Sequence, residues 1–235
     1  DAEGKEYIDF TSGIGVNALG YADPAWARAV ARQAGEIQHL CNYYYSPENT
    51  ALSEELCRAA GMAQAFFCNS GAEANECAFK VARKYGEGRG ASVILTLTDS
   101  FHGRTLATLS ATGQDVFHKD FQPLNPGFVY APGNDLQAVA GRLDGSVCAV
   151  LVETVQGEGG VVPMDGEYLQ GLQQLCREKD VLFMLDEVQT GVGRTGYFYS
   201  YQQWGLQPDV VTTAKGQAGG LPSGPCQEAE RVREL

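Results

Sequence analysis

Two charged residues follow apolar runs of the 235-residue sequence, at positions where a buried site can form. Asp186 comes directly after the run 181–185, and a carboxylate there needs a partner because burial of an unpaired charge is very costly. Lys215 comes after the run 209–212, and an amine in a desolvated pocket has a lowered pKa and can form a Schiff base. The pair indicates a ligand site in which Asp186 meets a cation, such as a protonated pyridine nitrogen. A helix-capping aspartate and an exposed lysine are the alternatives.

A third feature is the stretch Ser70-Gly71-Ala72-Glu73, which has the pattern of a capping box with Ser70 as N-cap. The amino end of a helix exposes free N–H groups and the positive end of the helix dipole. Small residues such as Gly71 and Ala72 allow a ligand to come close. The stretch therefore predicts either an anion site or simply a well-capped helix.

The stretch 191–196 matches G-x-G-x-x-G, the pattern of a dinucleotide-binding turn. Such a turn leads directly into a helix, but here Tyr197, Phe198 and Tyr199 follow. No acidic residue ends a strand about 20 residues later, as ribose recognition requires. We therefore expect no dinucleotide site, and the absence of G-x-x-x-x-G-K-[ST] excludes a P-loop.

The composition is that of an acidic protein with a sizeable core. Apolar residues make up 44% and charged residues 20%, and the formal net charge is −12. Because nucleic acids and anionic membranes attract clustered basic residues, we expect neither as a partner. Seven cysteines without a C-x-x-C pair, and three histidines without ligand spacing, predict reduced thiols, no metal site and a cytoplasmic location. The sequence also has no apolar run of membrane-spanning length and no signal-peptide pattern at its beginning.

Short apolar runs alternate with helical patterns along the chain. Several runs are apolar at consecutive positions, which is typical of strands that are covered on both faces. The predicted strands are 65–68, 92–97, 147–152, 181–185 and 209–212, and the predicted helices are 24–37, 50–60, 72–85, 135–143 and 166–179. This order predicts an α/β fold with a mainly parallel sheet, in which ligands bind beyond the carboxyl ends of the strands. We expect residues 1–40 to belong to a smaller N-terminal domain and residues 41–235 to form the large domain.

Five motifs in order along the chain resemble those of the class-III pyridoxal-phosphate (PLP) aminotransferases of fold type I. The motifs are 69–76 (NSGAEANE), 101–104 (FHGR), 153–160 (ETVQGEGG), 186–191 (DEVQTG) and 213–216 (TAKG). The resemblance implies a PLP-binding large domain whose mainly parallel sheet is flanked by helices, with the family's small C-terminal domain missing. It extends over about residues 7–222; residues 217–225 match only loosely, and the remainder reads as an unrelated tail.

The resemblance also implies roles for the candidate residues. Lys215 would hold PLP covalently and move the substrate proton, while Asp186 would keep the pyridine nitrogen protonated. Phe101 and Val188 would lie on opposite faces of the ring, and Gln189 would reach its phenolic oxygen. The implied cofactor-binding positions are Ser70, Gly71, Ala72, Phe101, His102, Asp186, Glu187, Val188, Gln189 and Lys215.

Substrate recognition would rest on Arg104, which offers a bidentate match to a carboxylate, and on Glu158, which would pair with a distal arginine in one half-reaction. Within the class, the chain is most similar to acetylornithine aminotransferases. This similarity implies transfer of the terminal amino group of N-acetylornithine to 2-oxoglutarate, a step of arginine biosynthesis, by a homodimer. Ile14 stands where ornithine-specific members have a tyrosine, which favours the acetylated substrate. Ornithine, succinylornithine and 4-aminobutyrate are alternative substrates, and a non-catalytic fragment that only associates with partner chains is an alternative role.

Overall fold

The site is built on a seven-stranded sheet in the order β1-β9-β8-β7-β4-β2-β3. The structure, a computed structural model, describes residues 1–41 and 43–233. The strands of this sheet are β1 (Gln64–Cys68), β2 (Val93–Leu97), β3 (Phe128–Ala131), β4 (Val147–Val152), β7 (Leu182–Asp186), β8 (Val210–Thr212) and β9 (Gly224–Glu228). Among these described strands only β9 runs antiparallel to its neighbours, so the predicted mainly parallel sheet is confirmed. A separate two-stranded hairpin is formed by β5 (Val155–Gln156) and β6 (Val162–Pro163).

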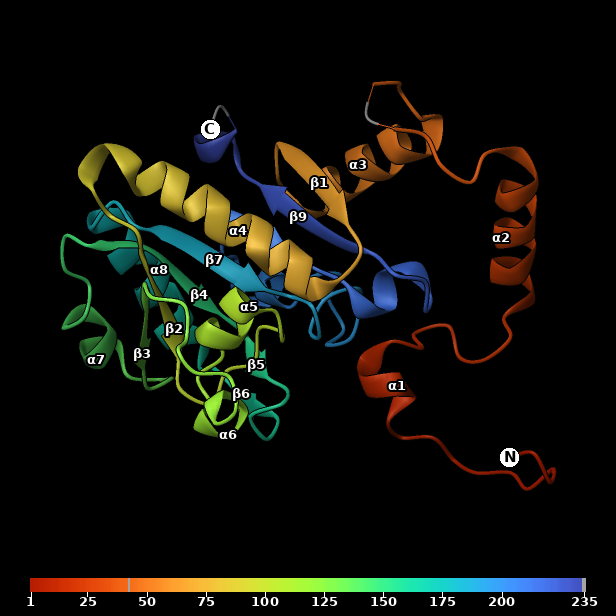
Figure 1. Cartoon of the computed structure of the whole chain (residues 1–235), viewed down its shortest axis with the longest axis horizontal. Helices are drawn as coiled ribbons and strands as arrows, with labels where there is room; N and C mark the ends of the chain where they lie inside the picture. Colours follow the sequence, from red (N-terminus) through yellow and green to blue (C-terminus); the bar gives the residue numbers. More distant parts are fainter. Residues whose placement is uncertain (42, 234–235) are drawn as a thin grey trace.

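Helices cover both faces of the sheet (Figure 1). Helix α4 (Gly71–Gly86) crosses one face, and α7 (Leu136–Ala140) and α8 (Gly166–Glu178) lie on the other. The remaining helices are α1 (Ser12–Gly15), α2 (Pro24–Glu36), α3 (Pro47–Ala60), α5 (Leu106–Ala111) and α6 (Asp115–His118), and the 3₁₀ turns are η1 (Glu87–Arg89), η2 (Ser200–Trp204), η3 (Lys215–Ala218) and η4 (Glu230–Val232). The predicted helices at 72–85 and 166–179 agree with α4 and α8 to within one residue at each end. None of the helices in the described ranges combines the length and apolar character needed to cross a bilayer.

Consecutive residues of the inner strands pack into two different hydrophobic cores. In β4, Val150 and Val152 join the core beneath α7 and α8, whereas Ala149 and Leu151 join the core beneath α4. Side chains of a strand alternate between the two faces of a sheet, so a strand covered on both faces must be apolar at every position. This arrangement explains the uninterrupted apolar runs in the sequence.

Strand β9 contradicts the expectation that the end of the chain is an unrelated tail. It lies between β1 and β8 and pairs with both. The sequence concealed it because glycine and proline, here Gly224 and Pro225, are rare inside strands. Gly224 is required at its position, since a Cβ there would collide with the carbonyl group of Ser70 at the amino end of α4. The tail therefore supports the helix end that the sequence analysis assigns to the site.

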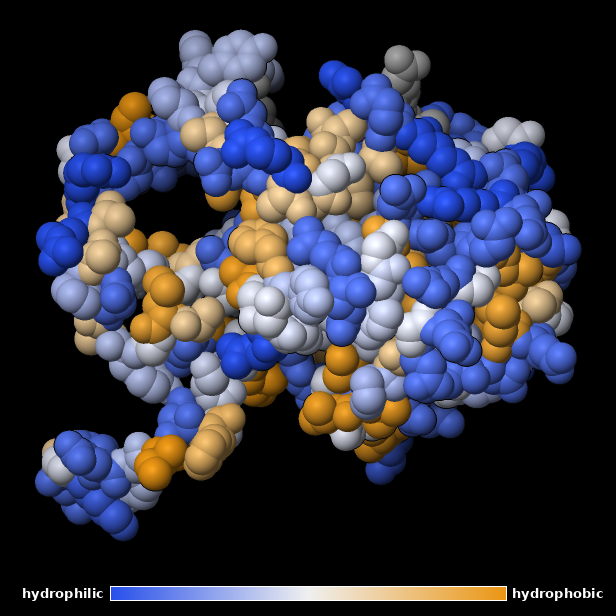
Figure 2. Space-filling model, turned by 180° about the vertical axis from the view of Figure 1, so that it is seen from behind, coloured by the Kyte–Doolittle hydropathy of each residue, from blue (hydrophilic) through white to orange (hydrophobic). Residues whose placement is uncertain are grey.

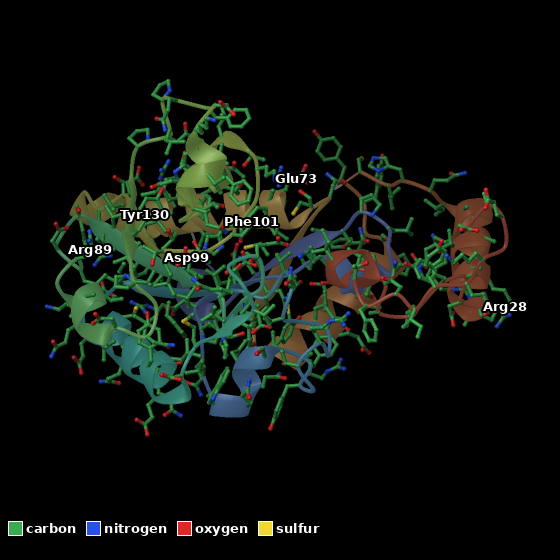
Figure 3. All side chains as sticks on the ribbon, turned by 90° about the horizontal axis from the view of Figure 1, so that it is seen from below. Arg28, Glu73, Arg89, Asp99, Phe101 and Tyr130 are labelled. Atoms are coloured by element: carbon green, nitrogen blue, oxygen red, sulfur yellow. The ribbon has the colours of Figure 1, made fainter. Side chains whose placement is uncertain are left out.

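Residues 1–41 extend away from the sheet (Figures 1 and 2). No residue of α1 or α2, both within the described part of the chain, is buried. In Figure 3, Arg28 of α2 lies well to one side of the α/β body. The segment nevertheless contacts that body through Trp26, whose Nε1 donates a hydrogen bond of 3.1 Å to the carbonyl oxygen of Ala218.

Candidate functional site

A cavity of about 440 Å³ opens beyond the carboxyl ends of β7 and β8, next to the amino end of α4. Ten of the predicted site residues line it: Ser70, Gly71, Ala72, Phe101, His102, Glu158, Asp186, Val188, Gln189 and Lys215. Figure 3 shows Phe101 near the amino end of α4, where Glu73 lies. Segments that are far apart in the sequence thus meet at the edge of the sheet where ligands of α/β proteins bind.

Asp186 ends β7 with only 4% of its surface exposed. Its Oδ2 accepts a hydrogen bond of 2.8 Å from Asn75 Nδ2 and lies 2.8 Å from His102 Nδ1. Its Oδ1 accepts a hydrogen bond of 3.0 Å from the backbone N–H of Val188. These contacts fix the carboxylate's orientation, and the only basic side chain found within ion-pairing distance of it among the described residues is that of His102. Asp186 is therefore arranged to meet a cationic group of a ligand bound in the cavity.

Asn75 is a site residue that the sequence analysis did not single out. It is buried on α4, where its Nδ2 also donates to the carbonyl oxygen of His102 at 2.8 Å. Its Oδ1 accepts a hydrogen bond of 2.7 Å from Thr212 Oγ1 at the end of β8. One amide thus connects α4, β7 and β8 around Asp186. The sequence does contain one signal for this residue: it is an asparagine next to Ala74, on the apolar side of a predicted helix, where a polar side chain needs a partner.

Lys215 begins η3, three positions after the last residue of β8. Its backbone φ of +48° lies in the left-handed region that residues other than glycine rarely adopt. Such a conformation persists only where the surrounding structure holds it, and it is common at functional sites. Burial lowers the pKa of the Lys215 amine below its ordinary value, whereas the neighbouring carboxylates, Glu158 foremost, act in the opposite direction. The lysine therefore has the environment of a reactive amine.

Glu153, directly after β4, is a second residue to which the sequence analysis gave no role. It lines the cavity and has only 8% of its surface exposed. Burial raises the pKa of this carboxyl well above its usual range, and the charge of Asp186 adds to the effect. Its Oε2 has no hydrogen-bond partner within residues 1–41 and 43–233. The raised pKa favours the protonated, uncharged form of Glu153, which can donate a hydrogen bond into the cavity.

The amino end of α4 differs in one detail from the predicted capping box. Ser70 Oγ accepts a hydrogen bond of 3.2 Å from the N–H of Glu73, as predicted. The Glu73 carboxylate, however, binds the backbone N–H of Asn69 at 2.6 Å rather than that of Ser70. Gly71 packs so closely that a Cβ would lie 2.8 Å from the methyl carbons of Val188. The absence of a Cβ at Gly71 thus lets Val188 pack against the first turn of α4, whose residues Gly71 and Ala72 line the cavity.

Glu187 was predicted to contact the cofactor, but it is not among the described residues that line the cavity. Its buried carboxylate accepts hydrogen bonds from the backbone N–H groups of Ser200 (2.9 Å) and Tyr201 (3.0 Å) and from Thr190 Oγ1 (2.8 Å). A charged residue next to Asp186 points to the other side of the strand because side chains alternate along it. We therefore assign Glu187 to anchoring the segment 190–201 rather than to the cofactor.

The burial of Glu187 predicts a pH dependence of stability. Burial raises the pKa of Glu187 from 4.5 to about 7, so the folded state holds a proton that the unfolded state releases. Stability from this group is therefore complete below about pH 4.5 and decreases by about 3 kcal/mol as the pH rises through about 7. Urea unfolding at about pH 5 and about pH 7.5 should show that Glu187→Gln removes this decrease. The exposed Glu54→Gln should keep it, and an unchanged slope in Glu187→Gln would contradict the prediction.

Arg104 is exposed and, like Glu187, lies outside the set of described cavity-lining residues. Its guanidinium carbon lies 5.1 Å from the ring centroid of Phe117 and 5.9 Å from that of Phe101, which places the cation over two aromatic faces beside the cavity. Inside the cavity, Gln189 Nε2 donates to Glu158 Oε1 at 3.4 Å. The N-terminal segment contributes Val16 to the lining, whereas Ile14 is 60% exposed.

The sequence matches the family described as aminotransferase class-III over residues 1–235. Acetylornithine aminotransferase of Haemophilus ducreyi is 50% identical over 238 residues, which cover 100% of this chain and 61% of that protein. Succinylornithine transaminase of Salmonella typhimurium is 49% identical over 227 residues, which cover 95% of this chain and 56% of that protein. The chain thus spans about three fifths of the length of these curated relatives.

The fold is shared with solved aminotransferases. The N-acetylornithine aminotransferase from Stenotrophomonas maltophilia superposes with a TM-score of 0.87 at 38% identity, covering 100% of this chain and 60% of its own. The ornithine aminotransferase from Toxoplasma gondii superposes with a TM-score of 0.94 at 30% identity, covering 100% of this chain and 57% of its own. The match includes the final residues, so the prediction of an unrelated tail was wrong, whereas the predicted family and fold type I are confirmed. The chain belongs to the class-III aminotransferases, a PLP-dependent family.

Proposed function

We propose that this chain is the PLP-binding part of an enzyme that transfers the terminal amino group of N-acetylornithine to 2-oxoglutarate, giving N-acetylglutamate semialdehyde and glutamate. The observation that carries the proposal is that Lys215 and Asp186 line one cavity at the amino end of α4. The acetylornithine aminotransferase of Haemophilus ducreyi, at 50% identity, supports the choice of substrate. A step in arginine biosynthesis in the cytoplasm would follow from that substrate.

The residues present fit PLP. The first turn of α4, whose residues Ser70, Gly71 and Ala72 line the cavity, offers backbone N–H groups that suit a phosphate. The buried Asp186 carboxylate suits a cationic ring nitrogen, and His102 Nε2, which has no partner in the described part of the chain, leaves a polar atom free near it. When bound, PLP supplies an electron sink for the negative charge that develops on the substrate carbon.

The protein's own side chains would hold the cofactor, transfer the proton and set the charge around the ring. Lys215 would hold the cofactor and then take the proton from the substrate carbon that bears the transferred amino group. The lowered pKa of its amine keeps a larger fraction of it neutral and able to accept that proton. Asp186, held by Asn75 and the N–H of Val188, would keep the ring nitrogen protonated. The raised pKa of Glu153 favours the uncharged form, which would add no further negative charge beside the ring.

Substrate carboxylates would be bound by Arg104, whose guanidinium is held over Phe101 and Phe117 at the side of the cavity. We expect Arg104→Ala to lower kcat/KM for both N-acetylornithine and 2-oxoglutarate by about 30- to 1000-fold, or about 2–4 kcal/mol, because a charge-assisted bidentate contact is lost. Steady-state kinetics in a protein that spans the full length of the relatives measures this, with the exposed Arg142→Ala as control. An unchanged kcat/KM for both substrates would remove Arg104 from the binding site.

The substrate is tested by a panel of amino donors with 2-oxoglutarate as acceptor. N-acetylornithine should be used best, and succinylornithine is the second candidate, because a succinylornithine transaminase is 49% identical to this chain. A preference of about tenfold or more for ornithine or 4-aminobutyrate, equivalent to about 1.4 kcal/mol, would contradict the assignment of N-acetylornithine as substrate. It would not contradict the assignment to the class-III aminotransferases. Cofactor binding without activity toward any donor would favour a non-catalytic fragment.

We also propose that the protein forms a homodimer in which residues 1–40, as a unit separate from the large domain, pack against the second subunit. Large apolar side chains in this segment are exposed, including Tyr7 (66%), Phe10 (92%) and Tyr21 (72%). Several large exposed apolar side chains within one short segment favour a protein–protein contact there. Light scattering that gives a monomeric mass at micromolar concentration would contradict this assignment.

A further inference from the structure

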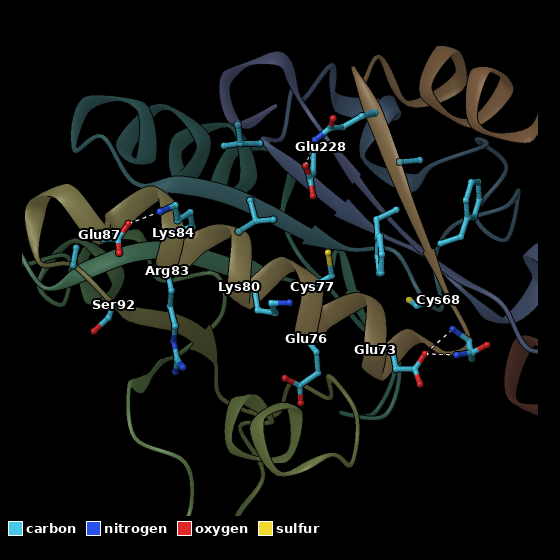
Figure 4. A pocket seen from close by; sticks show the side chains of 18 of the residues that line it. Cys68, Glu73, Glu76, Cys77, Lys80, Arg83, Lys84, Glu87, Ser92 and Glu228 are labelled. Atoms are coloured by element: carbon cyan, nitrogen blue, oxygen red, sulfur yellow. Dashed lines mark hydrogen bonds and ion pairs between the residues drawn. The ribbon is translucent and has the colours of Figure 1, made fainter. Parts of the chain in front are cut away.

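A second cluster of reactive side chains lies outside the cavity, between α4 and β9. Cys77 of α4 and Cys226 and Glu228 of β9 offer two sulfurs and a carboxylate oxygen that all lie within 4.8 Å of one another. Figure 4 shows Cys77 pointing from α4 toward the strand that carries Glu228. We propose that these three side chains bind one zinc ion.

The chemistry of the three side chains suits zinc better than the other common cations. Thiolates are the preferred ligands of zinc, and a carboxylate oxygen completes many of its sites, whereas calcium and magnesium require oxygen ligands only. In a tetrahedral site with Zn–S bonds of about 2.3 Å, two sulfurs lie about 3.8 Å apart. The cluster, with all ligand atoms within 4.8 Å, needs to close by only about 1 Å, which side-chain rotations can supply.

The surroundings of the cluster resemble those of a built site. Glu228, with 7% of its surface exposed, has its Oε2 held by Gln64 Nε2 at 2.5 Å, so the carboxylate is oriented by a neighbour as metal ligands usually are. Cys226 is completely buried, whereas Cys77 is only partly so. The site would therefore have two buried ligands on β9, Cys226 and Glu228, and one partly exposed ligand on α4, Cys77.

A groove of about 1370 Å³ gives access from solvent and leaves the fourth coordination position free for water or a further ligand. Cys77 and Glu228 line it, and so does Cys68 of the neighbouring strand β1. Lys80, one turn further along α4, also faces this groove near Cys77. Two thiolates and a carboxylate bound to a divalent ion carry one net negative charge, which the ammonium of Lys80 offsets.

Sequence spacing did not indicate this site because Cys77 lies about 150 residues before Cys226 and Glu228 in the sequence. Zinc sites readable from sequence have paired ligands a few residues apart, and the predicted absence of a metal site rested on the lack of such pairs. The two ligand-bearing elements become neighbours only because β9 inserts between β1 and β8. Zinc binding would release the two thiol protons to solvent and tie α4 to the sheet.

The experiment is a cobalt titration of the chain in the absence of PLP and substrate. The thiols are first reduced, and metals are removed with a chelator. One equivalent of Co²⁺ should give a thiolate-to-cobalt charge-transfer band together with the strong visible bands of a tetrahedral site, and Zn²⁺ should abolish both. Metal held at His102, Glu153 and Asp186, which also lie close together, would give no thiolate band. Because the readout requires neither cofactor nor substrate, failure of this proposal and failure of the proposed enzyme activity are distinguishable.

Three variants and one control decide the assignment. Cys77→Ser and Cys226→Ala should each weaken Co²⁺ binding by at least about 100-fold, because the thiolate ligands supply most of the affinity. Gln64→Leu should weaken it by about 10- to 100-fold, as loss of an orienting partner does. Cys57→Ser, on α3 and outside the cluster, should bind as the unaltered chain does. Circular dichroism checks that Cys77→Ser, at a partly exposed position, remains folded.

Absence of a saturable thiolate band at one Co²⁺ per chain would overturn the proposal. So would a band that persists in both Cys77→Ser and Cys226→Ala. A second readout is thermal unfolding, in which Zn²⁺ should raise the Tm of the unaltered chain and leave the Tm of folded Cys77→Ser unchanged.

Discussion

Replacement of Lys215 by alanine should abolish covalent attachment of PLP and lower transamination by about 10⁴-fold or more, because both the attachment point and the proton-transfer group are lost. The fold should survive this change. Lys215 has a φ of +48°, and alanine pays the same backbone cost in the left-handed region as lysine does. Loss of a half-buried amine among carboxylates also removes a charge that burial disfavours.

The measurement is the rate of amino transfer, in a protein that spans the full length of the relatives, together with the visible absorption of bound PLP in the present chain. Lys119→Ala removes an exposed lysine elsewhere and should leave both unchanged. Retention of more than about a tenth of the activity by Lys215→Ala would show that another group moves the proton.

Asp186→Asn should leave PLP bound but lower transamination by about 10²- to 10³-fold, the usual cost of removing one preorganised electrostatic contact. Asparagine preserves the shape of the side chain and can still accept the N–H of Val188. It lacks the negative charge that keeps a pyridine nitrogen protonated, so the ring would be a weaker electron sink. One of the polar contacts to Asn75 and His102 must also change, because an amide nitrogen donates where Oδ2 accepted.

A comparison of kcat with PLP affinity separates the two possible roles of Asp186. The electronic role predicts a large loss of kcat with PLP affinity and Tm changed little. A purely structural role predicts a lowered Tm with near-normal turnover in the protein that remains folded. Asp120→Asn, an exposed position, is the matched control for the loss of one carboxylate.

The sequence predicted the scaffold well where burial leaves a simple pattern. The predicted strand 147–152 coincides with β4, because a strand covered on both faces must be apolar throughout. Asp186 and Lys215 could be predicted as neighbours for a related reason: each follows an apolar run, and parallel strands end at the same edge of a sheet.

Other parts of the site could not be predicted, because they depend on contacts between residues that are far apart in the sequence. Asn75 and Glu153 are polar residues whose burial becomes evident only when α4, β4 and β7 are assembled around them. Glu187 lies next to Asp186 in the sequence, yet its carboxylate binds Ser200 and Tyr201 instead of lining the cavity. Strand β9 is short and contains glycine and proline, so its place in the sheet is determined by its neighbours rather than by its own propensity.

The central claim, that Lys215 and the residues around it form a PLP site, is tested most directly by chemical mapping. PLP is added to the purified chain, the covalent link is reduced with borohydride, and the labelled peptide is identified by mass spectrometry. The account predicts a single modified residue, Lys215, in a yield that falls sharply when inorganic phosphate competes for the amino end of α4. A label on another lysine, or no label at saturating PLP, would contradict it.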